Sequence, residues 1–193
     1  MNLIRELLYA DDCDFIAHSV QDMQHLMDNF TKARAAVGLT ISLKKTVVMY
    51  QPAPGKLYHG PNIYVYGKRL QEVDKFVYLG STLYRSCNFD SEVSLRIQKA
   101  SKSFGKLEKR LWCQHGILKE TKLKVYHACV LSSLLYACES WVVYRHHFRQ
   151  LERFHQQCLR RILSIHWTMY VSDVEVLEWS HCDSIEAMVL KSR

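Results

Sequence analysis

The sequence predicts an α+β fold, with short strands and one long helix in residues 1–85 and a bundle of helices in residues 90–193. Two patterns and one bulk property predict it. Before residue 85, β-branched and aromatic residues gather in short runs that turn residues interrupt. After residue 90, apolar residues recur at helical spacing. Apolar residues make up 48% of the chain, which is enough to bury an ordinary core.

The first predicted elements are a strand, an acidic turn and a second strand, followed by a helix. The turn is Tyr9-Ala10-Asp11-Asp12, with apolar residues on both sides. Ser19 and Asp22 then have the spacing of a capping box, and apolar residues recur at helical intervals until Gly38. We expect a helix from Ser19 to Val37 that packs against the hairpin.

Further strands complete the predicted first half. Thr46 to Tyr50 is β-branched and aromatic, and Phe76 to Leu79 has the same character. Ile63 and Val65 alternate between them. Together with the acidic hairpin, these runs predict a small antiparallel sheet.

The second half contains three apolar stripes at helical spacing and two shorter helix starts. Ser172 with Glu175, and Asp183 with Glu186, resemble capping boxes of two short final helices. A small helical bundle is therefore expected. The stripes are Val93, Ile97, Ala100, Phe104, Leu107 and Leu111; Leu123, Tyr126, Val130, Leu134 and Ala137; and Leu151, Phe154, Cys158 and Ile162.

Charge and cysteine content limit the classes of function. Lys and Arg number 26 against 19 Asp and Glu, so the net charge of +7 favours polyanionic partners such as nucleic acid. The seven cysteines have no repeated spacing and no signal peptide precedes them, which predicts a reduced intracellular protein of the nucleus or cytoplasm. The longest uncharged run, Val125 to Cys138, is shorter than the ~18 residues of a membrane span, so no membrane partner is expected.

The acidic turn is the strongest candidate for chemistry. Mg²⁺ prefers oxygen ligands from one or two carboxylates and from substrate phosphates, and Asp11 and Asp12 would supply such carboxylates at a hairpin tip. The alternative is a solvated turn, because aspartate is common in turns for its hydrogen bonds to the backbone.

The order of motifs after this turn resembles the reverse transcriptases of non-LTR (LINE-type) retrotransposons. Leu8 to Asp12 is similar to their catalytic motif, and Gly38 to Thr46 to the motif that follows, although Ser42 stands where the family usually has asparagine. Phe76 to Ser81 resembles their primer grip. Leu134 to Trp141 and Leu151 to Leu163 resemble their thumb and C-terminal region.

The resemblance implies a partial polymerase palm with a YADD turn in residues 1–85 and a helical thumb-like region in residues 90–193. It makes Asp11 a direct Mg²⁺ ligand and Asp12 its supporting carboxylate. Lys45 would neutralise the departing pyrophosphate. Alternatively, it would be a lysine at a strand edge that prevents pairing with another strand. Tyr78, Leu79 and Gly80 would form the primer-grip-like turn.

A row of arginines lies on the predicted helix that follows Tyr144. Arginine binds phosphate well because its planar guanidinium stays charged and donates two parallel hydrogen bonds. The row could therefore follow a nucleic-acid backbone, widened by His146, His147 and His155, or could be an ordinary solvated face. The members of this row, called the arginine stripe below, are Arg145, Arg149, Arg153 and Arg160.

No zinc site is expected. His155 with Cys158, and His181 with Cys182, are pairs without the four-ligand spacing of a structural zinc site. The four tryptophans could stack on bases, but their spacing favours core positions for most of them.

The implied parent activity is RNA-directed DNA synthesis, with an RNA template and a DNA primer duplex as partners and Mg²⁺ as cofactor. Related polymerases place another metal-binding aspartate and the fingers upstream, whereas this sequence begins a few residues before the YADD turn. We therefore expect a fragment that is inactive alone and binds Mg²⁺ weakly or not at all. The alternatives are a nucleic-acid-binding remnant and a degenerate transposon-derived protein without a catalytic role.

Overall fold

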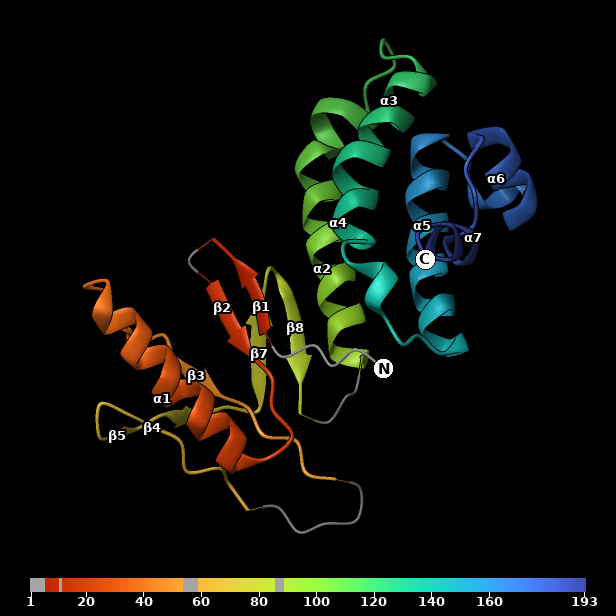
Figure 1. Ribbon diagram of the computed structural model, residues 1–193. Coiled ribbons are helices and arrows are strands. Elements are labelled where there is room, and N and C mark those ends of the chain that lie inside the picture. The colour runs from red at the N-terminus through yellow and green to blue at the C-terminus, as the bar shows by residue number, and fades with distance from the viewer. Residues whose placement is uncertain (1–5, 11, 54–58, 86–88) are drawn as a thin grey trace. The chain divides into compact units, whose positions relative to one another are not determined.

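The computed structural model describes residues 6–10, 12–53, 59–85 and 89–193 (Figure 1). The chain divides into two compact units, residues 1–87 and residues 88–193. In the described residues the first unit holds all of the strands and one helix, and the second is helical throughout. The architecture is therefore a mixture of helices and strands, which is compatible with the predicted α+β class.

The first unit begins with the predicted hairpin and helix. Strands β1 (Glu6–Tyr9) and β2 (Asp12–Phe15) pair in antiparallel fashion, with Tyr9 opposite Asp12. Helix α1 (Val20–Ala36) follows, and its N-cap Ser19 accepts a hydrogen bond from the Asp22 backbone N–H at 3.0 Å, as predicted. The helix packs against the hairpin through Phe30, whose ring centre lies 4.8 Å from that of Phe15.

The remaining strands of the first unit form pairs, so the predicted small antiparallel sheet is wrong in its topology. Within the described residues each ladder has only two strands, and one of them is parallel. Most of these strands are two residues long, which leaves too few ladder hydrogen bonds to join one pair to the next. The pairs are β3 (Val47–Val48) with β6 (Gln71–Glu72), β4 (Tyr64–Val65) with β5 (Lys68–Arg69), and β7 (Lys75–Tyr78) with β8 (Ser81–Tyr84).

A small apolar core and one side chain hold α1 against β4. Gln24 pairs with the backbone of Tyr64 much as a neighbouring strand would: its amide donates to the carbonyl at 2.9 Å and its oxygen accepts from the N–H at 2.8 Å. The buried apolar residues of this core are Met27, Val48, Ile63, Val65 and Leu70.

The second unit is built from three long helical segments and two short helices. In Figure 1, α2, the run from α3 to α4, and α5 lie side by side, and α6 and α7 lie against α5. The segments are α2 (Asp90–Leu107), continued by a π-helical turn at Glu108–Trp112; α3 (Lys119–Val125), a π-helical segment at Tyr126–Leu131 and α4 (Ser132–Leu134) in one run; a 3-10 turn at Cys138–Ser140; α5 (Arg145–Ile162); a 3-10 turn at Trp167–Met169; α6 (Asp173–Ser180); and α7 (Ile185–Lys191).

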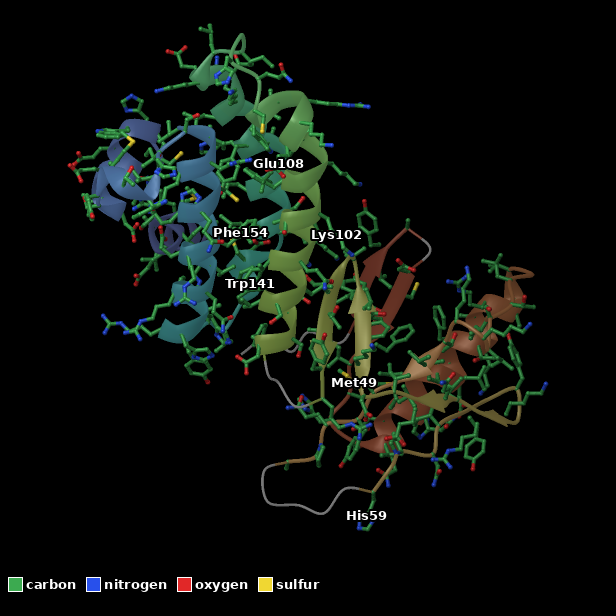
Figure 2. The ribbon with its side chains drawn as sticks, turned by 180° about the vertical axis from the view of Figure 1, so that it is seen from behind. Met49, His59, Lys102, Glu108, Trp141 and Phe154 are labelled. Atoms are coloured by element: carbon green, nitrogen blue, oxygen red, sulfur yellow. The ribbon has the colours of Figure 1, made fainter. Side chains whose placement is uncertain are left out.

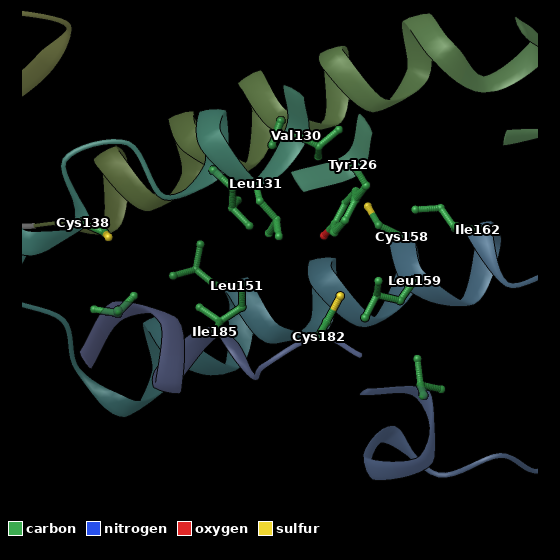
Figure 3. Close-up of a cluster of buried hydrophobic side chains, with 14 of the residues drawn as sticks. Tyr126, Val130, Leu131, Cys138, Leu151, Cys158, Leu159, Ile162, Cys182 and Ile185 are labelled. Atoms are coloured by element: carbon green, nitrogen blue, oxygen red, sulfur yellow. The ribbon is translucent and has the colours of Figure 1, made fainter. Parts of the chain in front are cut away.

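The predicted apolar stripes form the core of this unit (Figure 3). Tyr126 and Val130 from the second stripe face Leu151 and Cys158 from the third, and all four are buried. Ala137 departs from its stripe because the helix ends at Leu134 and Ala137 takes a left-handed conformation, with φ of 60°.

The two final helices start at serines. Ser172 caps α6 in the predicted capping box with Glu175. The predicted start at Asp183 is wrong by one residue, since Ser184 caps α7 and accepts from the Ala187 N–H at 3.3 Å. The Asp183 carboxylate instead pairs with Lys191 at 2.6 Å. Within the described ranges, none of the helices combines the length and the apolar character needed to cross a membrane.

Candidate nucleic-acid interface

The acidic hairpin presents carboxylates on one face of β2. Ala10 begins the turn in a left-handed conformation, with φ of 52°, and Asp12 follows it as an exposed residue. Asp11 lies outside the described residues, so its assignment as a Mg²⁺ ligand stays a prediction. Asp14, two residues beyond Asp12, shares its face of the strand. Burial raises the pKa of Asp14, and the neighbouring carboxylate of Asp12 raises it further.

Tyr78, from the primer-grip-like turn, lies near this hairpin. The pKa of its phenol is raised, first by burial and then by the negative charges of Asp14, Asp12 and Cys13. In Figure 1, the β7–β8 hairpin is drawn beside the β1–β2 hairpin. Two motifs far apart in the sequence therefore meet in the first unit.

The turn between β7 and β8 is tight and strained. Tyr78 pairs with Ser81, which leaves Leu79 and Gly80 as a two-residue connection. Both have positive φ, 45° for Leu79 and 82° for Gly80, as the turns favoured by two-residue hairpins require. Glycine adopts this conformation readily, whereas a leucine there costs roughly 1–2 kcal/mol. The turn thus holds an apolar side chain, 39% exposed, at its tip.

Lys45 lies in a turn before β3. The Ser42 carbonyl accepts hydrogen bonds from the backbone N–H groups of Lys45 and Thr46, both at 3.0 Å, and from the Thr46 hydroxyl at 2.9 Å. Ser42, where the family pattern has asparagine, thus closes the turn with its backbone. Lys45 precedes the strand and is exposed, so it is not part of a strand edge. In the described part of the chain, no hydrogen bond or ion pair joins it to Asp12.

The arginine stripe on α5 is shorter than the sequence predicts. Arg145, Arg149 and Arg153 are exposed, and no described residue accepts a hydrogen bond from their guanidinium groups. Arg160 is different, because it donates to the Val171 carbonyl at 2.9 Å and to the Asp173 carboxylate at 2.7 Å. Its charge is neutralised by the start of α6, so three arginines remain for an outside partner.

Two of the three histidines expected to widen this face are buried. His155 has no exposed surface and His147 has 1%, since both lie on the inner side of α5. His146 remains on the surface, but its Nε2 lies 2.9 Å from the Asp90 carboxylate. The expected widening of the arginine stripe by histidines is therefore wrong.

His146, His147 and Asp90 form a cluster with the spacing of a metal site. Their ligand atoms lie within 4.8 Å of one another. However, the Tyr144 backbone N–H donates to Nδ1 of His147 at 3.0 Å, which places the ring proton on Nε2. That Nε2–H then donates to Asp90 at 2.6 Å. A metal would need the atom that carries this proton, so the hydrogen bonds favour a structural link between the starts of α2 and α5.

Of the cysteine and histidine pairs noted in the sequence, His155, Cys158 and Cys182 are buried, whereas His181 is exposed. His155 contacts the Tyr126 hydroxyl through Nδ1 at 2.7 Å, and burial lowers its pKa to about 4. Burial also raises the pKa of the Cys158 thiol to about 12. Cys182 contacts His127 at 3.2 Å and does not pair with its neighbour His181. These thiols are protonated near neutral pH, whereas a nucleophile or a metal ligand must be a thiolate.

The tryptophans separate into two groups. Trp112 and Trp141 are 2% and 3% exposed and belong to the core of the second unit (Figure 2 labels Trp141). Trp167 and Trp179 are 77% and 50% exposed. The core position expected for most of the tryptophans is therefore found for two of them.

Comparisons with known proteins add one distant relative. No family model matches the chain, and no solved structure matches it. The chain is 24% identical over 164 residues to an uncharacterized transposon-derived protein of Caenorhabditis elegans. The match covers 84% of this chain and 57% of that protein, so the chain spans little more than half of its relative's length. This similarity suggests a transposon origin.

Proposed function

We propose that the chain derives from the reverse transcriptase of a non-LTR retroelement and that it binds duplex nucleic acid. The observation that carries this proposal is that the β7–β8 hairpin, which carries Tyr78, is drawn beside the β1–β2 hairpin, which carries Asp12 and Asp14 (Figure 1). A polymerase must hold the primer end beside the metal-binding carboxylates, because the attacking hydroxyl has to meet the activating ion. Here the segment that resembles the catalytic motif and the segment that resembles the primer grip lie beside each other in the same way.

The proposed cofactor is Mg²⁺, held weakly. Carboxylates are suitable ligands for this ion, and the exposed Asp12 beside a carboxyl of raised pKa, Asp14, fits such a site. Two-metal phosphoryl transfer also requires a carboxylate from another strand. We propose nucleic-acid binding as the activity of this chain.

The arginine stripe supplies the proposed duplex contact. Arg145, Arg149 and Arg153 are four residues apart along α5, so each is about 6 Å further along the helix axis than the last. Each strand of a DNA duplex carries one phosphate charge per about 3.4 Å of axis. A row of arginines about 6 Å apart can thus meet more than one phosphate of a duplex.

Charge reversal of Arg149 and Arg153 tests this proposal. We expect the double variant Arg149→Glu, Arg153→Glu to bind a hairpin duplex at least 10-fold more weakly, as measured by fluorescence anisotropy. The slope of log affinity against log salt should fall by about 1.8, since two phosphate contacts are lost. The loss should be equal for duplexes of different sequence, because phosphate contacts carry no base information.

Lys102 and Lys106 provide a matched control. They are exposed on α2 at the same four-residue spacing (Figure 2 labels Lys102), so Lys102→Glu with Lys106→Glu changes the net charge equally. We expect much smaller losses from this control. Equal losses from both variants would show that only net charge matters, and unchanged affinity in the arginine variant would contradict the proposed interface. Either outcome would favour the alternative of a degenerate transposon-derived protein.

A further inference from the structure

The loop between α5 and α6 holds two aromatic side chains in solvent. Trp167 is 77% exposed and Tyr170 is 89% exposed, and Met169 between them is 53% exposed. Large apolar groups that gather in one exposed place mark interaction sites more often than single exposed residues do. These side chains belong to one short segment, so the loop presents them together.

The loop is fixed at both ends, which keeps its aromatic residues outward. Ile165 and Val171 pack against the core of the second unit. Arg160 binds the Val171 carbonyl at 2.9 Å and the Asp173 carboxylate at 2.7 Å, and so ties the end of the loop to α5. Between these anchors lies a 3-10 turn at Trp167–Met169, and none of its residues is buried.

The backbone of the loop is also strained in a defined way. Ser164 and Tyr170 have φ values of 56° and 50°, a conformation that costs roughly 1–2 kcal/mol for residues other than glycine. Such strain persists only where the surrounding structure imposes it. The backbone that carries Trp167 and Tyr170 is therefore held in a defined conformation.

The charges around the loop select the ligand. Residues 153–172 include no aspartate or glutamate. Because Arg160 is paired with Asp173, the arginines left for a ligand in this range are Arg153, which is exposed, and Arg161. The Arg161 guanidinium is 57% exposed and pairs with Glu108 at 2.8 Å. Exposed aromatic rings beside exposed arginines are the combination that holds single-stranded nucleic acid, since each base offers a face for stacking and arginine binds the phosphates.

We propose that Trp167 and Tyr170 form a stacking platform for the unpaired bases of single-stranded nucleic acid. The proposal rests on the proposed function, in that the chain is taken to bind nucleic acid. It adds a second site with a different ligand, because bases in a duplex are already stacked and do not offer their faces to a side chain. The arginine stripe would hold the paired region and this platform the unpaired strand.

The test compares single-stranded and duplex probes on the full chain. We expect Trp167→Ala with Tyr170→Ala to weaken binding of an unstructured pyrimidine strand of about 10 nucleotides by at least 5-fold. Duplex affinity should change less than 2-fold. RNA and DNA strands should respond alike, since stacking uses the base and not the sugar. Trp167→Phe with Tyr170→Phe keeps both rings and should restore most of the affinity.

Trp179→Ala is the matched control, because Trp179 is a half-exposed tryptophan on α6 of the same unit. It should leave single-strand affinity unchanged, and thermal unfolding should confirm that every variant folds. Unchanged single-strand affinity in the double alanine variant would overturn the platform, as would an equal loss for duplex and single strand. The proposed function is judged separately by duplex binding of the arginine variant, so each proposal can fail without the other.

Discussion

At the scale of single residues, the hydrogen bond between Tyr126 and His155 places two polar groups inside an apolar core. The Tyr126 hydroxyl lies 2.7 Å from Nδ1 of His155, and neither side chain has any exposed surface. Water cannot solvate an imidazolium at this position, so burial lowers the pKa of His155 from 6.5 to about 4. The histidine is neutral in the folded protein and becomes protonated more easily when the chain unfolds.

This difference predicts a loss of stability in mild acid. Between pH 6.5 and pH 4 the unfolded chain binds more protons than the folded one, so the free energy of unfolding falls as pH falls through that window. From the pKa of about 4, the contribution of His155 between pH 7 and pH 5 is on the order of 2 kcal/mol. Urea unfolding of the native chain and of His155→Gln at both pH values measures it.

The glutamine variant serves as the reference because it cannot titrate, while every other histidine is retained. We expect the native chain to lose about 2 kcal/mol more than His155→Gln on going from pH 7 to pH 5. The same pH dependence in both proteins would show that His155 is solvated in the folded state.

At the scale of elements, helix caps fix where the short helices begin. Ser172 Oγ accepts from the Glu175 N–H at 3.3 Å, and the Glu175 carboxylate accepts from the Ser172 N–H at 2.7 Å. The hydrogen bonds from Ser172 lower the pKa of Glu175. The cap occupies two N–H groups that the helix itself cannot satisfy.

Removal of this cap gives the second stability prediction. Ser172→Ala should lower the free energy of unfolding by about 1 kcal/mol, because the first turn of α6 loses its side-chain acceptor. Ser101→Ala is the control, since Ser101 is an exposed residue inside α2, where alanine favours the helix. Chemical denaturation should show that Ser172→Ala lowers the free energy of unfolding, whereas Ser101→Ala raises it or lowers it less. A loss of the same size in both would mean that the cap contributes nothing specific.

The π-helical segment Tyr126–Leu131 is an element that the apolar spacing does not reveal. The second apolar stripe, which includes Tyr126 and Val130, has the same periodicity as an ordinary α-helix. Tyr126 and Val130 would be buried in an α-helix, and they are also buried in the π-helical segment. An extra residue in one turn shifts which side chains face outward, and π-helical turns of this kind occur often at functional sites. Here the segment leaves His127 exposed beside Cys182, which it contacts.

At the scale of the whole molecule, the two units differ in how much apolar surface they bury. The described core of the first unit consists of five residues, whereas the second has buried residues from each of its long helices. Stability of a small domain depends on the apolar area that it removes from water. The two units should therefore differ in their ability to fold alone.

We predict that residues 89–193, produced alone, fold into a helical domain with a cooperative thermal transition. Residues 6–85, produced alone, should unfold without a comparable transition, since their core is small. Circular dichroism during heating measures both. A non-cooperative melt of residues 89–193 would contradict the prediction and would mean that this core needs the rest of the chain.

The sequence by itself determined the features that depend on neighbours along the chain. The division into a strand-containing half and a helical half, the caps at Ser19 and Ser172, and the buried faces of α2 and α5 all follow from residues within a few positions of one another. Periodicity and capping are local, because a helix or a strand repeats within two to four residues. A local pattern can therefore be read directly from the sequence.

Only the tertiary structure decided which side chains find partners from distant segments. Arg160 and Arg153 are alike in the sequence, yet the start of α6 reaches only Arg160. Trp141 is 3% exposed and Trp167 is 77% exposed for a similar reason, since helices cover Trp141 and do not cover Trp167. The β7–β8 hairpin, which carries Tyr78, is drawn beside the acidic hairpin although the two are far apart in the sequence (Figure 1). Burial and charge at these positions depend on contacts between elements far apart in the chain, which spacing along the sequence does not encode.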